Sequence, residues 1–462
     1  MIRIYDTLSR SLKEFKPLQP GHVRVYSCGP TVYHFAHLGN LRTYIFSDLL
    51  RRILEYNGLA VEQGMNITDV GHLVGDGDEG EDKMEVGAKR EGKHPLEVAK
   101  FYEAKFLEDT DKLNIKPAHS LIRATDTVPE QIEIIKLLED KGFIYQDESA
   151  IYFNTSKFSG YGKLSGQKLA DKKTGAREEV IIDSGKKNPQ DFALWFFLAG
   201  RYKDHVLHWP SPWGEGFPGW HIECSAISRK ILGQPFDIHT GGVDFIGTHH
   251  ANEIAQSEAA YGLPLANYWL HGEFLLINEG RMGKSEGNAY TLDTILEKGF
   301  SALDFRYLCL TANWNTQLSF SWDSLKAARQ TREKLTTFAS QPKPSGQPIP
   351  AYETKFLDFI NDNLNIPKAL ALAWEMVKDP QYGTREKTAT LIKFDQVFGL
   401  NLGRTENTAT ASIPASIQKL LGQRAQAKKA KDFALADRLR TEIESQGYKV
   451  QDTPDGQIAK TK

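Results

Sequence analysis

A strand, a helix and a second strand follow one another within residues 23–70, and this order constrains the fold most. Residues 23–28 (VRVYSC) alternate and are rich in β-branched and aromatic side chains, which predicts a strand ended by Gly29 and Pro30. From Asn40 the chain carries apolar residues at helical spacing up to Gly58, and residues 60–70 predict the next strand. Such a βαβ unit predicts a parallel sheet in an α/β fold.

The rest of the chain divides by changes in pattern. Within residues 71–93 a Gly- and Asp-rich loop leads into a charged helix, and further helices are predicted over 96–113 and 128–142. Residues 143–215 have the short strands and charged turns of a small mixed insertion, including a strand over 178–183. The α/β pattern resumes at 235–262, strand-like residues 269–277 run into a Gly-rich loop, and helices follow residue 322. After a polar linker at 401–414, residues 416–447 predict one long basic helix.

Composition restricts the class of protein. The chain has 462 residues, 40% hydrophobic and 25% charged, so two to four globular domains are expected. Its net charge of −2 gives no global attraction for nucleic acid, which must then bind to local basic patches. Three cysteines do not suit a disulfide framework, and we find neither a signal peptide nor an apolar run long enough to span a membrane. A cytoplasmic enzyme is expected.

Four residues offer ligands for a metal. His249 and Glu253 are four residues apart on a predicted helix and share one face, while Cys28 stands at the carboxyl end of a strand and Cys224 lies in GWHIECS. Zinc accepts thiolate, imidazole and carboxylate ligands. Each residue alone also suits a simpler role, because a lone cysteine is usually a small buried hydrophobe and a lone helix histidine is usually solvated. Cys309, among apolar residues, is assigned to the core.

Two segments suit phosphate groups. His34, His37, Gly39 and Asn40 lie where the first helix begins, and helix N-termini favour anions; a capped helix with surface histidines is the alternative. The loop 280-GRMGKSEGN-288 carries Arg281 and Lys284 between glycines, and a solvated basic turn is the alternative there. This loop does not match the spacing of a P-loop.

Five stretches of the chain carry a family resemblance: 27-SCGPTVYHFAHLGNLRTY-44, 66-NITDV-70, 209-WPSPWGEGFPGWHIECSA-226, 238-IHTGGVDFIGTHHANEIAQS-257 and 281-RMGKSEGN-288. With these stretches the chain resembles, across essentially its whole length, the cysteinyl-tRNA synthetases of class I. The resemblance implies an α/β fold with a Rossmann-like parallel-sheet catalytic core. It further implies a mixed α/β insertion, a helical bundle and a small C-terminal anticodon-binding domain.

The resemblance also implies domain bounds and site residues. The catalytic core would span 1–122 and 216–266, with a connective insertion at 123–215, a KMSKS-loop and stem-contact region at 267–321, a helical bundle at 322–404 and an anticodon-binding domain at 405–462. The metal ligands would be Cys28, Cys224, His249 and Glu253. The cysteine pocket would comprise Cys28, Gly29, Thr31, Thr68 and Trp220. ATP would meet His34, His37, Gly39, Asn40, Asp244, Arg281, Met282, Gly283, Lys284 and Ser285, with His37, Asn40 and Lys284 as the catalytic groups.

Some positions depart from the family pattern. The resemblance implies that residues 37–40 are the class I HIGH element and residues 281–285 the KMSKS loop. Asn40 stands at the fourth position of the HIGH element, and Arg281 and Gly283 replace lysine and serine in the KMSKS loop, which keeps one charge and loses one hydroxyl. The lysine-rich KIIK stretch appears as 83-KMEV-86, so a side activity that needs its second lysine is in doubt. The C-terminal IAKTK lacks a tryptophan found in many members.

The resemblance implies that cysteine is activated with ATP and Mg²⁺ and transferred to tRNA(Cys), with one Zn²⁺ per chain and a monomeric protein. The tRNA is expected at a basic surface with an aromatic residue for stacking: Arg424, Lys428, Lys429, Lys431, Phe433, Arg438 and Arg440. A solvated amphipathic helix is the alternative for these residues. Two other functions remain open, a ligase that joins cysteine to a small amine and a non-catalytic tRNA- or zinc-binding relative.

Overall fold

The computed structural model describes residues 1–74, 78, 80–166, 185–277, 280–281, 289–340, 346–403, 415–430, 432–453 and 456–461. The chain forms two compact units, Met1–Asn401 and Leu402–Lys462. Among the described residues, no helix is both long and apolar enough to cross a membrane.

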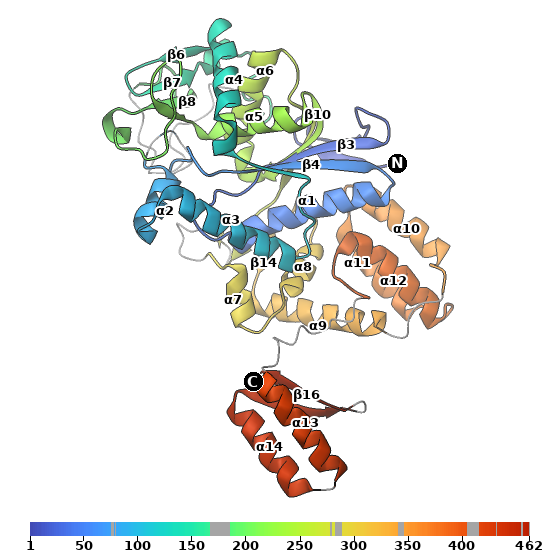
Figure 1. Ribbon diagram of the computed structural model, residues 1–462. Coiled ribbons are helices and arrows are strands. Elements are labelled where there is room, and N and C mark those ends of the chain that lie inside the picture. Colours follow the sequence, from blue (N-terminus) through green and yellow to red (C-terminus); the bar gives the residue numbers. More distant parts are fainter. Residues whose placement is uncertain are drawn as a thin grey trace. The chain divides into compact units, whose positions relative to one another are not determined.

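A five-stranded sheet is the centre of the first unit (Figure 1). Every neighbouring pair in it is parallel, as the βαβ pattern predicts. The central strands are almost entirely buried, because helices cover both faces of the sheet. In spatial order the strands are β11 (Ala266–Gly272), β10 (Phe236–Gly242), β3 (His22–Ser27), β4 (Ala60–Ile67) and β5 (Ser120–Arg123).

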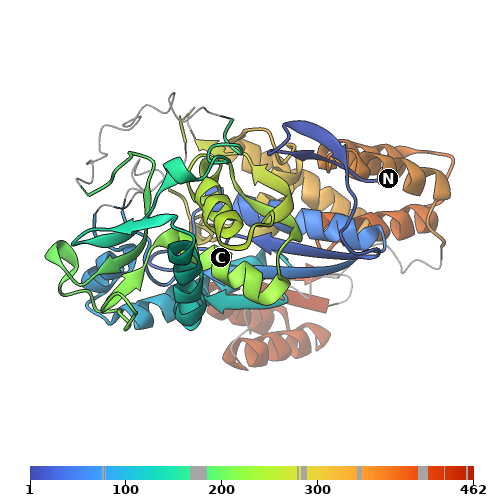
Figure 2. The same ribbon diagram turned by 90° about the horizontal axis from the view of Figure 1, so that it is seen from above.

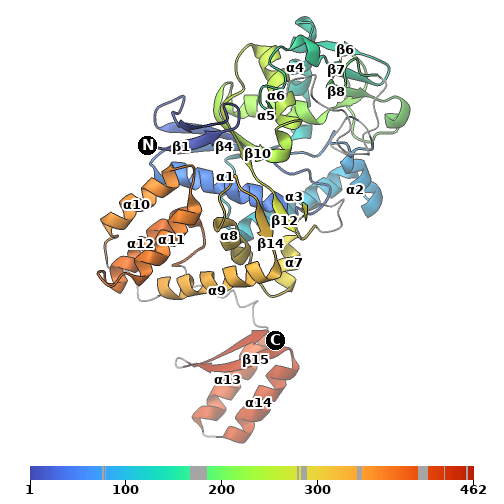
Figure 3. The ribbon, with the colours of Figure 1, turned by 180° about the vertical axis from the view of Figure 1, so that it is seen from behind.

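Helix α1 (Leu38–Tyr56) follows β3 and covers one face of the sheet, and α5 (Trp220–Leu232) and α6 (His249–Tyr261) cover the other (Figures 1 and 3). The start of α1 is fixed by a capping box, in which His37 Nδ1 accepts from the Asn40 N–H and Asn40 Oδ1 accepts from the His37 N–H, both at 3.2 Å. Because α1 also contacts helices on its far side, it is buried almost all round.

The insertion is a four-stranded antiparallel sheet, which Figure 2 shows in teal and green beside the core. Its strand order is β6 (Ile144–Gln146), β7 (Ala150–Phe153), β8 (Phe192–Phe197) and β9 (Gly216–Pro218). Helix α4 (Val128–Asp140) packs against it through Val128, Ile135 and Leu138. The strand predicted at 178–183 lies outside the described residues.

Several short strands were not predicted from the sequence. Residues Arg3–Asp6 (β1) and Ser11–Glu14 (β2) form an antiparallel hairpin, and Leu318–Phe320 (β14) pairs in parallel with Leu275–Ile277 (β12), whose other neighbour is Gly280–Arg281 (β13). The remaining helices before residue 320 are α2 (Lys83–Glu91), α3 (Pro95–Lys112), α7 (Leu292–Glu297) and α8 (Ala302–Leu310), and short 3-10 turns occur at Ala124–Thr127, Thr155–Lys157, Gly200–Tyr202 and Val243–Phe245.

The helical part that follows residue 322 is tied to the core by a buried ion cluster. Arg306 on α8 has no exposed surface and donates to Asp48 Oδ2 on α1 (2.5 Å), to Phe398 O (2.7 Å) and to Leu113 O (3.1 Å). Arg52 donates to the same Asp48 oxygen at 2.7 Å. Phe398 is the last residue of α12 (Thr384–Phe398), and the other helices of this part are α9 (Trp322–Ala339), α10 (Pro350–Asn361) and α11 (Ile366–Lys378).

The second unit corrects one prediction, because residues 416–447 do not form a single helix. The chain turns between α13 (Ala415–Lys429) and α14 (Phe433–Ser445), where Asp432 caps α14 by accepting from the Leu435 N–H at 3.0 Å. An antiparallel hairpin of β15 (Tyr448–Thr453) and β16 (Gly456–Thr461) follows. Ile417, Ile443 and Val450, from α13, α14 and β15, form the small core of this unit.

Candidate active site

The four predicted metal ligands converge at the carboxyl edge of the parallel sheet. Cys28 follows β3 directly, Cys224 lies on α5, and His249 and Glu253 lie one turn apart on α6. One donor atom from each lies within 4.8 Å of all the others, and all four side chains are buried. These residues, distant in the sequence, therefore meet in one buried cluster.

The donor set fits zinc. A tetrahedral zinc ion with ligands at about 2.0–2.3 Å holds its donors within about 4 Å of one another. The four donors of this cluster lie within 4.8 Å of one another, which is close to that spacing. His249 Nε2 lies 3.4 Å from Cys224 Sγ and 3.1 Å from Glu253 Oε1. Two thiols, an imidazole and a carboxylate in one buried place are the ligands that soft or borderline divalent ions prefer.

The cluster is strongly polarised. Burial by itself raises the pKa of Glu253, but His239 and His249 outweigh it and lower this pKa to about 2. Burial lowers the pKa of His249, but the Glu253 carboxylate outweighs it and raises this pKa to about 10. For Cys28, burial raises the pKa, and the hydrogen bond with Cys224 and the charge of His239 bring it down to about 7. The cluster therefore favours the Glu253 carboxylate and eases ionisation of Cys28, but it also holds His249 protonated, and burial raises the pKa of Cys224 well above its usual value. His249 and Cys224 would both have to lose a proton to ligate a metal.

Sequence reasoning missed a second layer of histidines. His239 Nε2 lies 2.9 Å from Glu253 Oε2, and His250 Nε2 lies 3.2 Å from Cys28 Sγ. With Cys28 and Glu253 these two histidines form a second group whose donors are also close together. His250 in turn lies 2.8 Å from His271 Nε2. Such partners orient ligands, and the adjacent pair His249-His250 in the sequence was the available signal.

The predicted cysteine pocket borders this cluster. A Cβ on Gly29 would lie 1.7 Å from the Asn66 carbonyl oxygen, so only glycine allows the chain after Cys28 to pass β4 so closely. Thr31 and Thr68 form a bridge, in which the Thr68 N–H donates to Pro30 O at 3.0 Å. The Trp220 ring stacks on His72 with centroids 3.6 Å apart and lies 4.3 Å from the His249 ring.

Glu223 is a further residue of this pocket that the sequence did not reveal. It stands beside Cys224 on α5, is 2% exposed, and accepts through Oε1 from the Thr68 hydroxyl and from Asn66 Nδ2 (3.4 Å). Burial raises the pKa of its carboxyl group well above the usual value. In the sequence alone, nothing in the spacing of GWHIECS distinguishes this glutamate from an ordinary surface glutamate.

Four of the residues predicted for ATP, His34, His37, Gly39 and Asn40, lie at or just before the start of α1. His37 and Asn40 form its capping box, and a Cβ on Gly39 would lie 3.0 Å from the His37 ring, which crowds that turn. The Leu38 N–H donates to Tyr290 O at 2.8 Å, which brings residues just beyond the 280–288 loop to this helix start. His34 stacks on Tyr102 with ring centroids 5.9 Å apart.

Asp244 is exposed and lies in the 3-10 turn Val243–Phe245, which follows the carboxyl end of β10. Arg281 ends β13, where it pairs with Leu276 of β12. Met282, Gly283, Lys284 and Ser285 lie outside the described residues.

Comparison with known proteins decides the family. The family described as "tRNA synthetases class I (C) catalytic domain" matches residues 14–330, and "Cysteinyl-tRNA ligase anticodon binding domain" matches residues 410–458. A Burkholderia lata protein named cysteine--tRNA ligase 1 is 44% identical over 457 residues, which cover 99% of this chain and 96% of that protein. A Treponema denticola cysteine--tRNA ligase is 40% identical and covers 98% of both chains.

The chain belongs to the cysteinyl-tRNA synthetase family. Its fold is shared with other class I synthetases of low sequence identity. A Mycobacterium tuberculosis methionyl-tRNA synthetase in complex with methionyl-adenylate has a TM-score of 0.56 at 17% identity over 90% of this chain and 96% of that one. An Agrobacterium radiobacter leucyl-tRNA synthetase in a ternary complex has a TM-score of 0.59 at 10% identity, over 84% and 85% of the two chains.

In this member of the cysteinyl-tRNA synthetase family, the predicted tRNA surface of the second unit is partly accessible. Phe433 is 63% exposed, and Lys428, Arg438 and Arg440 are exposed as well. Arg424 is only 3% exposed, so its guanidinium group is not part of that surface. Lys429 ends α13, and Lys431 lies outside the described residues.

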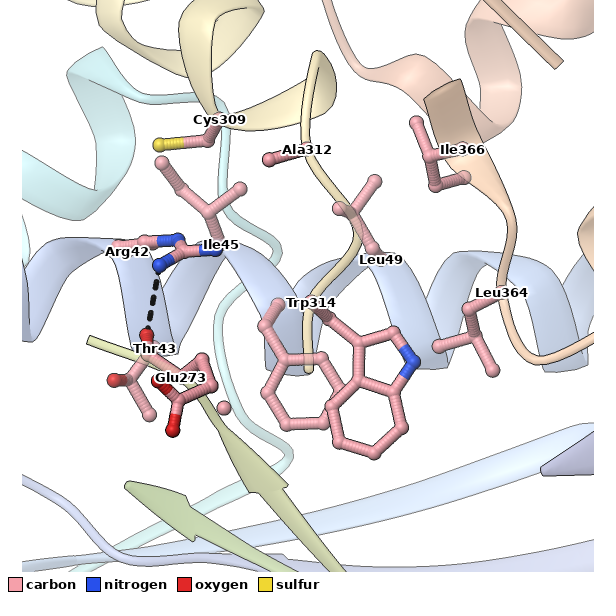
Figure 4. A pocket seen from close by; sticks show the side chains of 12 residues that line it. Arg42, Thr43, Ile45, Leu49, Glu273, Cys309, Ala312, Trp314, Leu364 and Ile366 are labelled. Atoms are coloured by element: carbon pink, nitrogen blue, oxygen red, sulfur yellow. Dashed lines mark hydrogen bonds between the residues drawn. The ribbon is translucent and has the colours of Figure 1, made fainter. Parts of the chain in front are cut away.

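A cavity of about 20 Å³ on the far side of α1 is distinct from the predicted pocket (Figure 4). It is lined mainly by apolar side chains, among them Ile45, Leu49 and Trp314, and by the buried thiol of Cys309. Arg42 donates to the Glu273 main-chain oxygen at 2.9 Å beside it. This volume holds about one water molecule, too little for an amino acid or a nucleotide.

Proposed function

We propose that the chain activates L-cysteine with ATP to cysteinyl-adenylate and transfers the cysteinyl group to tRNA(Cys). The observation that carries this proposal is the buried cluster of Cys28, Cys224, His249 and Glu253 at the carboxyl edge of a class I synthetase sheet. Family membership supports tRNA(Cys), cysteine and ATP as the partners. The domain bounds expected from the sequence and a monomeric state are part of this proposal.

The four cluster residues would hold one zinc ion. An apolar pocket separates cysteine from serine poorly, because the two differ only by sulfur in place of oxygen. A zinc ion held by these residues would supply the discrimination, since the substrate thiol would bind as a thiolate, whereas a hydroxyl group keeps its proton. Gly29, Thr31, Thr68 and Trp220 would then enclose the rest of the amino acid.

In the first step a carboxylate oxygen of cysteine attacks the α-phosphorus of ATP, and pyrophosphate leaves with Mg²⁺. His37 and Asn40 at the start of α1, together with Lys284, would stabilise the charge that grows on the phosphate oxygens. His34, Gly39, Asp244 and the residues Arg281, Met282, Gly283 and Ser285 would bind the nucleotide. Positioning and electrostatics account for this step, so no protein nucleophile is required.

In the second step a hydroxyl of the terminal tRNA ribose attacks the adenylate carbonyl carbon, and AMP leaves. The second unit would hold the anticodon through its exposed cations Lys428, Arg438 and Arg440, with Lys429 and Lys431, and Phe433 would stack on an unpaired base. Binding that involves phosphate contacts weakens as salt rises. Charge reversal at Arg438 or Arg440 should therefore weaken tRNA binding and reduce its salt dependence.

The test is amino-acid-dependent exchange between ATP and pyrophosphate, with cysteine and with serine, and with zinc content measured on the same sample. We expect exchange with cysteine only, one zinc per chain, and loss of both in Cys28→Ser. Cys309→Ser, a buried cysteine away from the cluster, is the matched control and should retain both. Exchange at the normal rate in a zinc-free Cys28→Ser protein would contradict the proposal, and transfer to small amines instead of tRNA would favour a different ligase.

A further inference from the structure

Glu223 carries a buried oxygen that the fold leaves unused. Its Oε1 atom accepts from Thr68 and Asn66, but Oε2 is buried and has no hydrogen-bond partner within the described part of the chain. A buried carboxylate oxygen without a donor or a cation is costly, so such an oxygen calls for a partner that binds there.

Glu223 lies among the predicted cysteine-binding residues. The Gly29 N–H donates to Asn66 Oδ1 at 2.7 Å, and Asn66 Nδ2 donates both to Thr68 Oγ1 (3.0 Å) and to Glu223 Oε1 (3.4 Å). This chain of bonds runs from the residue after Cys28 to the residue before Cys224. The oxygen therefore belongs to the same end of the sheet as the two thiols.

The polar groups of cysteine indicate which group could bind to Glu223 Oε2. Cysteine has three polar groups, and the proposed function assigns the thiol to the metal and the carboxylate to ATP. The ammonium group remains, and it lies three bonds from the sulfur. An ammonium group donates three hydrogen bonds and carries the charge that a buried carboxylate needs.

We propose that Glu223 Oε2 accepts a hydrogen bond from the α-ammonium group of bound cysteine, which makes Glu223 a further substrate-binding residue. This inference rests on the proposed function, because it takes cysteine as the ligand. Thr68 has a positioning role in it: by donating to Oε1 it fixes the carboxylate and directs the second oxygen to the substrate. The selected ligand class is a free α-amino acid with a thiol, as opposed to a thiol acid without the amine.

The experiment compares two ligands that differ by this group. L-cysteine and 3-mercaptopropionate, which lacks the ammonium group, are titrated calorimetrically into the zinc-loaded full-length protein. In Glu223→Gln the amide retains the acceptor for Thr68 but places N–H donors toward the ammonium. We expect cysteine affinity to fall about 10- to 100-fold and the affinity for 3-mercaptopropionate to stay unchanged.

A matched control and a second variant complete the design. Glu258→Gln removes a carboxylate at the far end of α6 that pairs with Lys163, and it should leave both affinities unchanged. If Glu223→Gln does not fold, Glu223→Asp keeps the charge but withdraws the oxygen, and it should weaken cysteine more than 3-mercaptopropionate.

Equal weakening of both ligands, or no weakening of either, would overturn the assignment of Glu223 and leave the proposed function intact. Failure of both ligands to bind the unaltered zinc-loaded protein would instead overturn the proposed function itself.

Discussion

Asp48 is the acceptor on which the junction between the sheet and the helical part depends. Its side chain is buried at the middle of α1, and its Oδ2 receives both Arg306 and Arg52. Burial would raise the pKa of Asp48, but the charges of Arg306 and Arg52 keep it below its usual value, so it is ionised at neutral pH. Asp48→Asn would retain the Oδ1 acceptor for the Lys116 N–H (2.9 Å) and direct an amide at two guanidinium groups.

The expected cost follows from the charge that is left behind. Removing one partner of a buried ion pair costs about 3–5 kcal/mol, because the other charge stays buried without compensation. Arg306 also donates to main-chain oxygens of Leu113 and Phe398, so it cannot move to solvent without breaking these bonds. We therefore expect Asp48→Asn to lower the free energy of unfolding of the first unit by about 3–5 kcal/mol.

The assay is urea denaturation at neutral pH, followed by tryptophan fluorescence. Glu333→Gln is the matched control, because it removes an exposed partner of Arg329 and should cost below about 1 kcal/mol. The double variant Arg306→Met/Asp48→Asn should cost about 1–3 kcal/mol less than the sum of the two single variants, since it removes the Arg306 charge and leaves only Arg52 without its partner. A cost for Asp48→Asn no greater than that of Glu333→Gln, or strict additivity in the double variant, would refute the reasoning.

Three further predictions concern the site. Gly29→Ala puts a methyl group against the Asn66 carbonyl, so we expect metal analysis to show loss of bound zinc and the free energy of unfolding to fall by at least about 1–3 kcal/mol. A methyl group at Gly422 meets no atom, so Gly422→Ala should leave the free energy of unfolding unchanged or raise it slightly. Cys224→Ala should reduce zinc content from one per chain to none, and a fully loaded variant would show that Cys224 is no ligand. Burial raises the pKa of Asp69 to about 6, so the folded protein binds this proton more tightly than the unfolded chain does and gains stability as pH falls from about 6 toward 4. Asp69→Asn should thus be more stable than the unaltered protein by up to about 3 kcal/mol at neutral pH and lose this advantage near pH 4, and a pH-independent difference would contradict the assignment.

Periodicity made the core of the fold predictable. The alternation before Cys28 and the helical spacing after Asn40 reflect burial on defined faces, and the structure confirms β3, α1 and β4 close to the expected bounds. The prediction of one long C-terminal helix was wrong because the apolar spacing continues across Asp432, and a single capping interaction decides where the chain turns. Strands such as Leu318–Phe320 are too short to show a period and exist because a partner strand is present.

The site was predictable where residue chemistry is rare. The chain has only three cysteines, and the spacing of His249 and Glu253 puts both on one helix face, so Cys28, Cys224 and His249 were predictable as candidate ligands. His239 and Glu223 were not, because a histidine in a strand and a glutamate in a helix usually have ordinary roles. Their significance depends on the 2.9 Å approach of His239 to Glu253 and on one buried oxygen, and both arise only from tertiary packing.

The proposed metal ligands are distributed along the chain in a way that has a consequence for synthesis on the ribosome. Cys28 is made early, but Cys224 follows nearly 200 residues later, and Glu253 follows after that. A nascent chain that ends before α6 holds at most two of the four donors, and it has neither His249 nor the carboxylate that charges this imidazole. The proposed selection of sulfur over oxygen would therefore arise late in translation, and a truncated product would lack it however well its first strands have folded.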